Sequence, residues 1–534
     1  MGLNACMGLA DGSSLVLNVP IVGSAVGTER SAVHRLELDD GDYVEGALDS
    51  GAEAAELRLI DRRGLPTRLL LNGTTGRTIF RFVAGSETAA LRVTLRTAGD
   101  YRLTLTRRIA EEDQRPVPRE HLSPTVAALA AELERGGGTE AFWREVTRRG
   151  TPLVELLEPG RALMTFLVRG ARHNVRLLGG PTSNHENLER LGTSDVWLKS
   201  FIVPTSTRLS YQIAPDVPDF PGTCRECREA ILAQLRSDPL NHRPWPADAP
   251  DPYNQFSLVE LPDAPPQPGI DEAGIDEADS AKAAPAGRLV TARFESRTLG
   301  NAREVAVYLP PGVDPKAAGT VLLLLFDGPD YLGPRAPVPL MLDRLTGDGR
   351  LPPTMAVFIG NPNAEARARE LPANPDFAAM LAGELLPWLT ERTGVRPRPG
   401  RTVLAGSSYG GLAAVTAALA RPERFGNALS ISGSFWWHPA DAPTDRPEYV
   451  AKRVASRERR PVRLFLSAGL FESTIDGEIG ILESSRHLRD VLEAKGYNVT
   501  YRDYAAGHDY FAWRGALGDG LLALFGREKW KWPN

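Results

Sequence analysis

After residue 288 the chain alternates short apolar runs with stretches of helical character, and this alternation restricts the fold more than any other feature of the sequence. The runs are residues 321–326, 355–359, 403–405, 428–431 and 462–466, the last two with one polar residue each. A short run without polar alternation is typical of a strand buried on both faces. Residues 288–534 are therefore predicted to form a mostly parallel, doubly wound sheet with helices on both faces.

The chain ahead of this domain is predicted to contain two β-rich, sandwich-like domains. Residues 28–115 alternate apolar and polar positions between turn-forming residues, which is typical of a small β-sandwich, and residues 1–27 are expected to be an N-terminal tail. Residues 125–261 begin with a helical stretch and continue as alternating strands. Residues 262–287 are rich in Pro, Ala, Asp and Glu and have no aromatic residue, so a linker is expected there.

One motif within the α/β domain indicates a catalytic serine. The sequence Gly406-Ser407-Ser408-Tyr409-Gly410 has the pattern G-x-S-x-G, between an apolar run and a helical stretch of small residues. This order of strand, tight turn and helix is the nucleophile elbow of the α/β-hydrolases. Ser408 is therefore the predicted nucleophile, and the alternative is an ordinary glycine-rich loop between a strand and a helix.

A serine nucleophile needs a base, and in this fold the base follows the serine and the acid along the chain. His508 comes after the strand-like residues 498–504, where the base belongs, and is predicted to fill this role. His487 lies in a helical stretch, which favours a surface position, and His438 lies on a loop that could line the pocket.

The acid of the triad is expected after the run at 462–466. Glu472 is the favoured residue, with Asp476 and Glu478 close behind it. The alternative is that these are solvated loop charges and that a backbone carbonyl orients His508.

The oxyanion hole is expected to use two backbone N–H groups. One belongs to Tyr409, the residue after the nucleophile. The second comes from the loop after 321–326, where Pro329 has no N–H, so that Gly328 or Asp330 must donate.

Several stretches around these candidates resemble the enterochelin (enterobactin) esterase family, within the esterase D-like group. In the α/β domain they are 327–328, 367–374, 384–387, 405–412, 421–426, 432–437, 507–509 and 513–515. Upstream they are 142–143, 150–154, 192–197, 238–241 and 259–265. The resemblance covers roughly residues 140–527 and omits the first ~120. Pro329 and Arg369 depart from residues that the family often carries.

The resemblance implies a serine esterase that hydrolyses the trilactone of a ferric catecholate siderophore such as enterobactin and releases its iron. It implies that Arg367, Arg369 and Arg514 pair with the anionic complex. It further implies that Trp436 and Trp437 stack on the catechol rings. The alternative for each of these residues is a surface ion pair or core packing.

Other functions remain open at this stage. A feruloyl or acetyl carbohydrate esterase would use the same fold and triad, with the β-rich segment as a glycan-binding module. A siderophore-binding protein without catalysis could keep the fold, although an intact triad argues against it. An acyltransferase would share the acyl-enzyme, because water and an acceptor alcohol compete for it.

Composition excludes further classes. The net charge of −5 argues against nucleic acid as a partner, and no apolar run reaches the ~18 residues of a membrane span. The first residues do not form a signal peptide, so a cytoplasmic location is expected, with the periplasm as the alternative if the start site is misplaced. Cys6, Cys224 and Cys227 are interpreted as incidental thiols, and no metal or cofactor is predicted.

Overall fold

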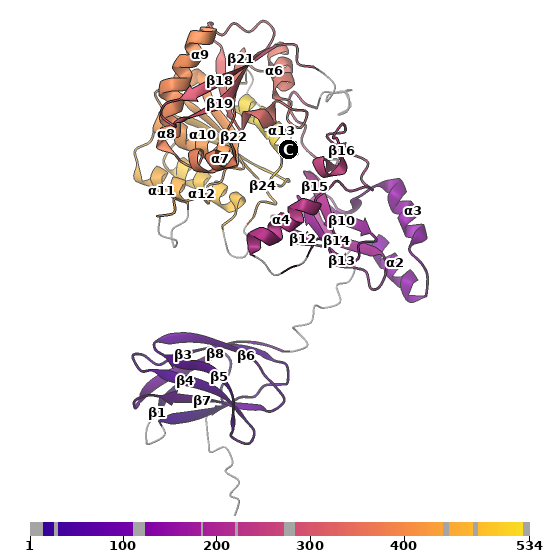
Figure 1. Ribbon diagram of the computed structural model, residues 1–534, viewed down its shortest axis with the longest axis vertical. Coiled ribbons are helices and arrows are strands. Elements are labelled where there is room, and N and C mark those ends of the chain that lie inside the picture. Colours follow the sequence, from indigo (N-terminus) through magenta and orange to yellow (C-terminus); the bar gives the residue numbers. More distant parts are fainter. Residues whose placement is uncertain are drawn as a thin grey trace, which may run out of the picture. The chain divides into compact units, whose positions relative to one another are not determined.

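The computed structural model describes residues 14–25, 30–110, 123–182, 185–218, 220, 223–271, 284–441, 448–473 and 479–526, apart from the side chain of Cys224. The chain divides into two compact units, residues 1–120 and 121–534. Figure 1 labels their helices and strands. The two units are described separately below.

The first unit contains two antiparallel four-stranded sheets. One has the order β1 (Ile21–Ala25), β8 (Gly99–Ile109), β3 (Tyr43–Asp49), β6 (Arg77–Val83). The other has the order β2 (Ser31–Arg35), β7 (Thr88–Leu95), β4 (Ala55–Asp61), β5 (Pro66–Thr74). Alternate residues such as Phe80 and Phe82 of β6 enter one shared core, as expected for a sandwich.

The start of this sandwich corrects the predicted N-terminal tail. Strand β1 lies within residues 1–27 and pairs with β8 from Ile21 opposite Leu103 to Ala25 opposite Gly99. Leu15 is also buried in the same core. The sandwich therefore begins before residue 28, because its first strand takes its partner from the far end of the domain.

The second β-rich domain opens with helices α2 (Pro124–Glu134) and α3 (Glu140–Arg149) and continues as two sheets. The first sheet has the order β13 (Glu189–Arg190), β14 (Val196–Pro204), β10 (Arg161–Arg169), β9 (Leu153–Glu158). The second has the order β12 (Glu186–Asn187), β11 (Val175–Leu178), β15 (Arg208–Pro215), β17 (Phe256–Glu260), β16 (Pro244–Trp245). Helix α4 (Cys224–Gln234) lies between β15 and β16 in the chain.

The α/β domain is built on one eight-stranded sheet. Its order is β18 (Arg288–Ser296), β19 (Asn301–Leu309), β21 (Thr354–Ile359), β20 (Val321–Phe326), β22 (Thr402–Ser407), β23 (Asn427–Ile431), β24 (Arg463–Gly469), β25 (Asn498–Tyr504). The pairings of β18 with β19 and of β19 with β21 are antiparallel, and all the others are parallel. The predicted mostly parallel sheet is thus present.

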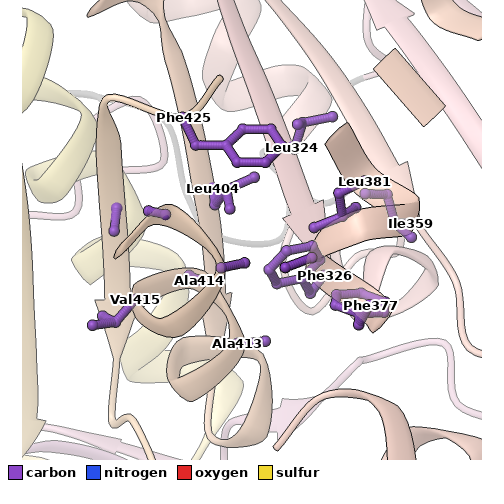
Figure 2. Packing of buried hydrophobic residues seen from close by; sticks show 14 of the residues in the cluster. Leu324, Phe326, Ile359, Phe377, Leu381, Leu404, Ala413, Ala414, Val415 and Phe425 are labelled. Atoms are coloured by element: carbon purple, nitrogen blue, oxygen red, sulfur yellow. The ribbon is translucent and has the colours of Figure 1, made fainter. Parts of the chain in front are cut away.

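Helices cover both faces of this sheet. Leu322, Leu324 and Phe326 of β20 face α8 (Pro375–Met380), α9 (Leu386–Thr393), α10 (Tyr409–Ala420), α11 (Tyr449–Ser456) and α12 (Ile481–Ala494), and Figure 2 shows part of this packing. Leu323 and Leu325 face α6 (Val338–Gly347) and α13 (Tyr510–Phe525). Each apolar run therefore supplies both cores, which explains why these strands lack polar alternation.

The first part of the predicted linker is folded. Gln267 donates from Nε2 to the carbonyl of Phe511 at 2.6 Å and accepts from Arg514 Nε at 2.7 Å. Ile270 is buried in the core beneath α6 and α13. Residues 262–271 are thus fixed by contacts with folded domains, and of the predicted linker only 272–283 lie outside the described residues.

Candidate active site

The predicted nucleophile lies in a sharp turn between β22 and α10. Ser408 has φ 57° and ψ −123°, a conformation that residues with a side chain rarely adopt. A Cβ on Gly406 would lie 2.7 Å from the carbonyl carbon of Gly410, so only glycine fits there. A strained turn of this kind presents a serine hydroxyl at the carboxyl edge of a parallel sheet.

The predicted acid and base are in contact at that edge. His508 lies between β25 and α13, and Glu472 follows β24. His508 Nδ1 lies 2.5 Å from Oε1 of Glu472, whose carboxylate is buried. When Nδ1 carries the proton toward a carboxylate, Nε2 is left free to accept one. This arrangement suits a general base.

A buried serine that sequence reasoning missed holds the other oxygen of the acid. Oε2 of Glu472 accepts from Ser432 Oγ at 2.7 Å and from the N–H of Gly469 at 2.6 Å. Ser432 Oγ in turn accepts from Trp513 Nε1 at 3.0 Å, and the Trp513 ring stands edge-on to the His508 ring at 4.6 Å. The only available signal was that Ser432 and Trp513 both lie in stretches that resemble the esterase family.

We expect Ser432→Ala to reduce kcat on a small activated ester roughly ten-fold, because Glu472 loses part of its positioning. The free energy of unfolding should fall by about 1–3 kcal/mol, since Trp513 Nε1 is left buried without its acceptor. Ser430→Ala is the matched control: Ser430 lies two residues earlier, on β23, and its buried Oγ has no hydrogen-bond partner among the described residues. Equal kcat values for the two variants would show that Ser432 does not position the acid.

Backbone contacts bring the predicted nucleophile to the same edge as the predicted acid and base. Ser408 N–H donates to the carbonyl of Ile431 at 3.0 Å, and Ile431 directly precedes Ser432. Ser408 Oγ lies 3.4 Å from Ser434 Oγ. Within the described part of the chain no hydrogen bond joins Ser408 Oγ to His508, and bonds of this type commonly tighten when substrate binds.

The loop after β20 lies against the first turn of α10. A Cβ on Gly410 would lie 3.3 Å from Asp327 Oδ2, so this loop approaches the first turn of α10. Tyr409 is the first residue of that helix, and its N–H therefore has no carbonyl partner within the helix. The N–H of Asp330 donates to the carbonyl of Asp327 at 3.1 Å. Gly328 is buried and a Cβ there would lie 2.5 Å from Ile359 N. This favours Gly328 over Asp330 as the second oxyanion donor.

Arg367 is directed at this loop. Its Nε and Nη2 bind the two carboxylate oxygens of Asp327 at 2.7 and 2.8 Å, and Asn361 Nδ2 donates to the same carboxylate at 2.6 Å. Hydrogen bonding to Asp327 raises the pKa of the Arg367 guanidinium. The guanidinium also lies 5.6 Å from the centre of the Tyr409 ring. Arg367 therefore holds the loop after β20 through Asp327.

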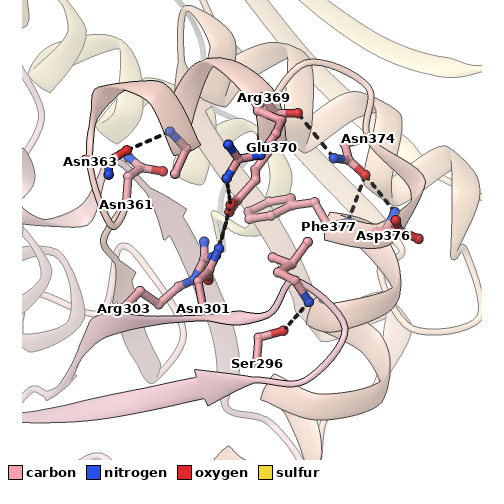
Figure 3. Close-up of polar contacts among 12 residues, drawn as sticks. Ser296, Asn301, Arg303, Asn361, Asn363, Arg369, Glu370, Asn374, Asp376 and Phe377 are labelled. Atoms are coloured by element: carbon pink, nitrogen blue, oxygen red, sulfur yellow. Dashed lines mark hydrogen bonds and ion pairs between the residues drawn. The ribbon is translucent and has the colours of Figure 1, made fainter.

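Of the other two predicted arginines, one is exposed and one is buried. Arg369 is exposed and contacts Glu370 and Glu365, and Figure 3 shows it beside Glu370, which also binds the buried Arg303. Arg514 is only 3% exposed, and its guanidinium contacts Gln267 and the ring of Phe511. The prediction that Arg514 binds substrate is therefore corrected: this side chain packs inside the unit.

The two tryptophans also differ. Trp436 is 38% exposed, and its ring lies 6.3 Å from that of Tyr409, the residue after the nucleophile. Trp437 is half-buried, packs on the core under α10 and meets the Tyr449 ring edge-on at 5.8 Å. Trp436 is thus the better placed of the two to contact a ligand at Ser408.

Three residues named in the predictions lie outside the described part of the chain, and other predictions concern metal sites and membrane spans. Asp476, Glu478 and Cys6 lie outside them, and Cys227 is an exposed free thiol. Across the described segments, no group of three or more His, Cys, Asp or Glu side chains is suited to hold a metal ion. No helix in the same segments is long and apolar enough to cross a membrane.

Comparison with known proteins supports the resemblance. A family profile described as "Putative esterase" matches residues 296–524, and one described as "Enterochelin esterase, N-terminal" matches residues 163–270. The iron(III) enterobactin esterase of Dickeya dadantii is 33% identical over 445 residues, which are 76% of this chain and 97% of that relative. The iron(III) salmochelin esterase of Escherichia coli O6:H1 is 30% identical and aligns over 75% of this chain and 98% of its own length.

Comparison with solved structures identifies the same kind of protein as the sequence comparison. The ferric enterobactin esterase of Salmonella typhimurium superposes with a TM-score of 0.59 at 29% identity, covering 72% of this chain and 98% of that one. The enterobactin esterase of Shigella flexneri, crystallised in the presence of enterobactin, gives 0.56 at 30% identity over the same shares. The predictions of a carboxylic ester hydrolase and of its family are confirmed: the chain belongs to the iron(III) enterobactin esterase family.

Proposed function

We propose that this chain is a serine esterase of the α/β-hydrolase fold that hydrolyses the trilactone esters of a ferric catecholate siderophore such as enterobactin, releasing its iron. The observation that carries the proposal is the contact of His508 with the buried carboxylate of Glu472, at the same sheet edge as the Ser408 turn. It occurs in a chain that is 33% identical to an iron(III) enterobactin esterase over nearly all of that relative's length.

In the proposed reaction, Ser408 Oγ attacks an ester carbonyl carbon while His508 Nε2 accepts the hydroxyl proton. The N–H groups of Tyr409 and Gly328 stabilise the oxyanion that forms. Collapse of this intermediate breaks the bond to the neighbouring serine unit, whose oxygen leaves with the proton from His508. Water then gives a proton to His508 and attacks the acyl carbon, and collapse of this second intermediate returns the proton from His508 to Ser408 Oγ and releases the carboxylic acid. Glu472 holds the imidazole and stabilises its charged form throughout.

The surroundings of the nucleophile suit a flat, anionic substrate. The rings of Trp436 and Tyr409 lie at one side of Ser408, and aromatic surfaces stack on aromatic ligands. Arg367 is about one-third exposed beside Tyr409 and supplies positive charge, part of which Asp327 neutralises. We propose Trp436 and Arg367 as the ligand-contacting residues, with Trp437 and Arg369 at the margin of the site.

Turnover of matched substrates tests the proposal. We expect kcat/KM on ferric enterobactin to exceed that on feruloyl sugar esters by at least about 100-fold, because contacts remote from the reacting bond hold the larger substrate in place. The assay follows release of linear catechol–serine products by chromatography, with salmochelin and bacillibactin as further substrates. Preferential cleavage of feruloyl sugars would instead identify a carbohydrate esterase. If Ser408 did not react with a fluorophosphonate probe, the chain would instead be a siderophore-binding protein without catalysis.

A further inference from the structure

The acid and the base lie on two short loops that bind each other. Residues after β24 carry Glu472, and residues after β25 carry His508. The N–H of Leu470 donates to the carbonyl of Tyr504 at 2.8 Å, and the N–H of Phe471 donates to the carbonyl of Ala506 at 3.1 Å. A displacement of either loop would therefore move both catalytic groups relative to Ser408.

The acid loop is anchored outside its own domain. Phe471, the residue before Glu472, packs against the core of the second β-rich domain. That core consists of Ala162, Met164, Phe166, Val168, Ala171, Val175, Leu177, Leu188, Trp197, Val203, Leu209, Tyr211, Ile213, Val259 and Leu261. A partly buried aromatic side chain in this position ties the loop to the neighbouring domain through an apolar contact.

The base loop is anchored to the same domain. On β15, the N–H of Arg208 donates to the carbonyl of Ala505 at 3.0 Å, and the N–H of Ser210 lies 3.4 Å from Oδ2 of Asp509. Asp509 also caps α13 through the N–H groups of its second and third residues. Burial raises the pKa of Asp509 to about 6. On the other side of His508, a Cβ on Gly507 would lie 3.9 Å from the carbonyl oxygen of Gly180 in the β-rich domain.

We infer that the second β-rich domain positions the catalytic acid and base, and that Phe471 is the positioning residue through which it holds Glu472. The inference rests on the proposed triad. The domain thus takes part in acyl transfer itself, for small and large esters alike, beyond any part it has in binding the siderophore. Positioning of this kind carries weight because a misplacement of about 1 Å can reduce a rate about 100-fold.

The full-length Phe471→Ala variant tests this inference on a small activated ester, whose turnover does not require binding of the siderophore. We expect kcat on p-nitrophenyl acetate and the rate of fluorophosphonate labelling of Ser408 to fall roughly 10- to 100-fold, with KM little changed. Phe201→Ala is the matched control: Phe201 is also partly buried, packs on the same core and belongs to the β-rich domain itself. It should lower thermal stability comparably while kcat stays within about two-fold of wild type.

Phe471→Leu keeps most of the apolar contact and should restore most of the rate. If the alanine variant does not fold, the leucine variant still provides the test, with labelling slowed about two- to five-fold. Unchanged labelling in a folded Phe471 variant, or an equal loss of rate in Phe201→Ala, would overturn the inference. Wild-type protein that the probe does not label would overturn the proposed triad instead, so the two failures are distinguishable.

Discussion

Replacing Ser408 by alanine should abolish ester hydrolysis while the protein still binds the ferric siderophore with nearly unchanged affinity. In the proposed reaction the hydroxyl of Ser408 forms the covalent bond to the acyl group, whereas Ser407, the other serine of the motif, is buried. Loss of a triad serine typically costs more than ~10⁴-fold in rate. The residues proposed to contact the ligand, Trp436 and Arg367, are left in place by the substitution.

Two measurements check this expectation: single-turnover hydrolysis of ferric enterobactin, and quenching of tryptophan fluorescence by the bound complex. Ser407→Ala is the matched control, because Ser407 is the preceding residue and its buried Oγ accepts a hydrogen bond from Tyr331 at 2.9 Å. That variant should lose stability and keep kcat within about ten-fold of wild type. A Ser408→Ala protein that retains more than roughly a tenth of wild-type activity would show that the nucleophile lies elsewhere.

The sheet could be predicted because each of its central strands is marked by residues that are adjacent in the sequence. Strands such as β20 supply alternate residues to two cores, so they read as unbroken apolar runs in the sequence. The turn at Ser408 could be predicted for the same reason, since a Cβ on Gly406 would lie 2.7 Å from the carbonyl carbon of Gly410, a close approach within five residues. Both features depend on neighbours in the chain.

The predictions that the structure corrects all depend on contacts between residues that are distant in the sequence. The sequence predicts a tail where strand β1 lies, because the partner of this strand, β8, is formed some eighty residues later. Residues 262–271 have the composition of a linker, and only the contacts of Gln267 and Ile270 with distant helices fix them. The sequence predicts a ligand-binding role for Arg514, because nothing near this residue in the chain reveals that Gln267 and Phe511 enclose it.

The same reason explains why part of the candidate site was missed. Ser432 has φ 47° and a hydroxyl placed between Trp513 and Glu472, two residues that follow it by 81 and 40 positions. A serine after a buried strand carries no pattern that distinguishes it from a structural one. The contact of Phe471 with the β-rich domain is hidden in the same way, since an apolar residue before an acidic one is common in any loop.

Replacing Glu472 by glutamine should lower kcat by up to about 10⁴-fold and leave KM nearly unchanged. The substitution keeps the shape of the side chain and removes its charge. Three donors face the carboxylate: His508 Nδ1, Ser432 Oγ and the N–H of Gly469. An amide offers one acceptor oxygen, so its NH₂ group must face at least one of these donors.

If the NH₂ group faces His508, the imidazole takes the tautomer with its proton on Nε2, and this nitrogen can no longer accept the proton of Ser408. If it faces Ser432 and Gly469, two buried donors lose their acceptor and the loop shifts. Either orientation also removes the charge that stabilises the imidazolium. Asp476→Asn, outside the described residues, is the control, with kcat expected within about two-fold of wild type. Equal small losses in both variants, measured as kcat on p-nitrophenyl acetate, would show that no carboxylate orients His508.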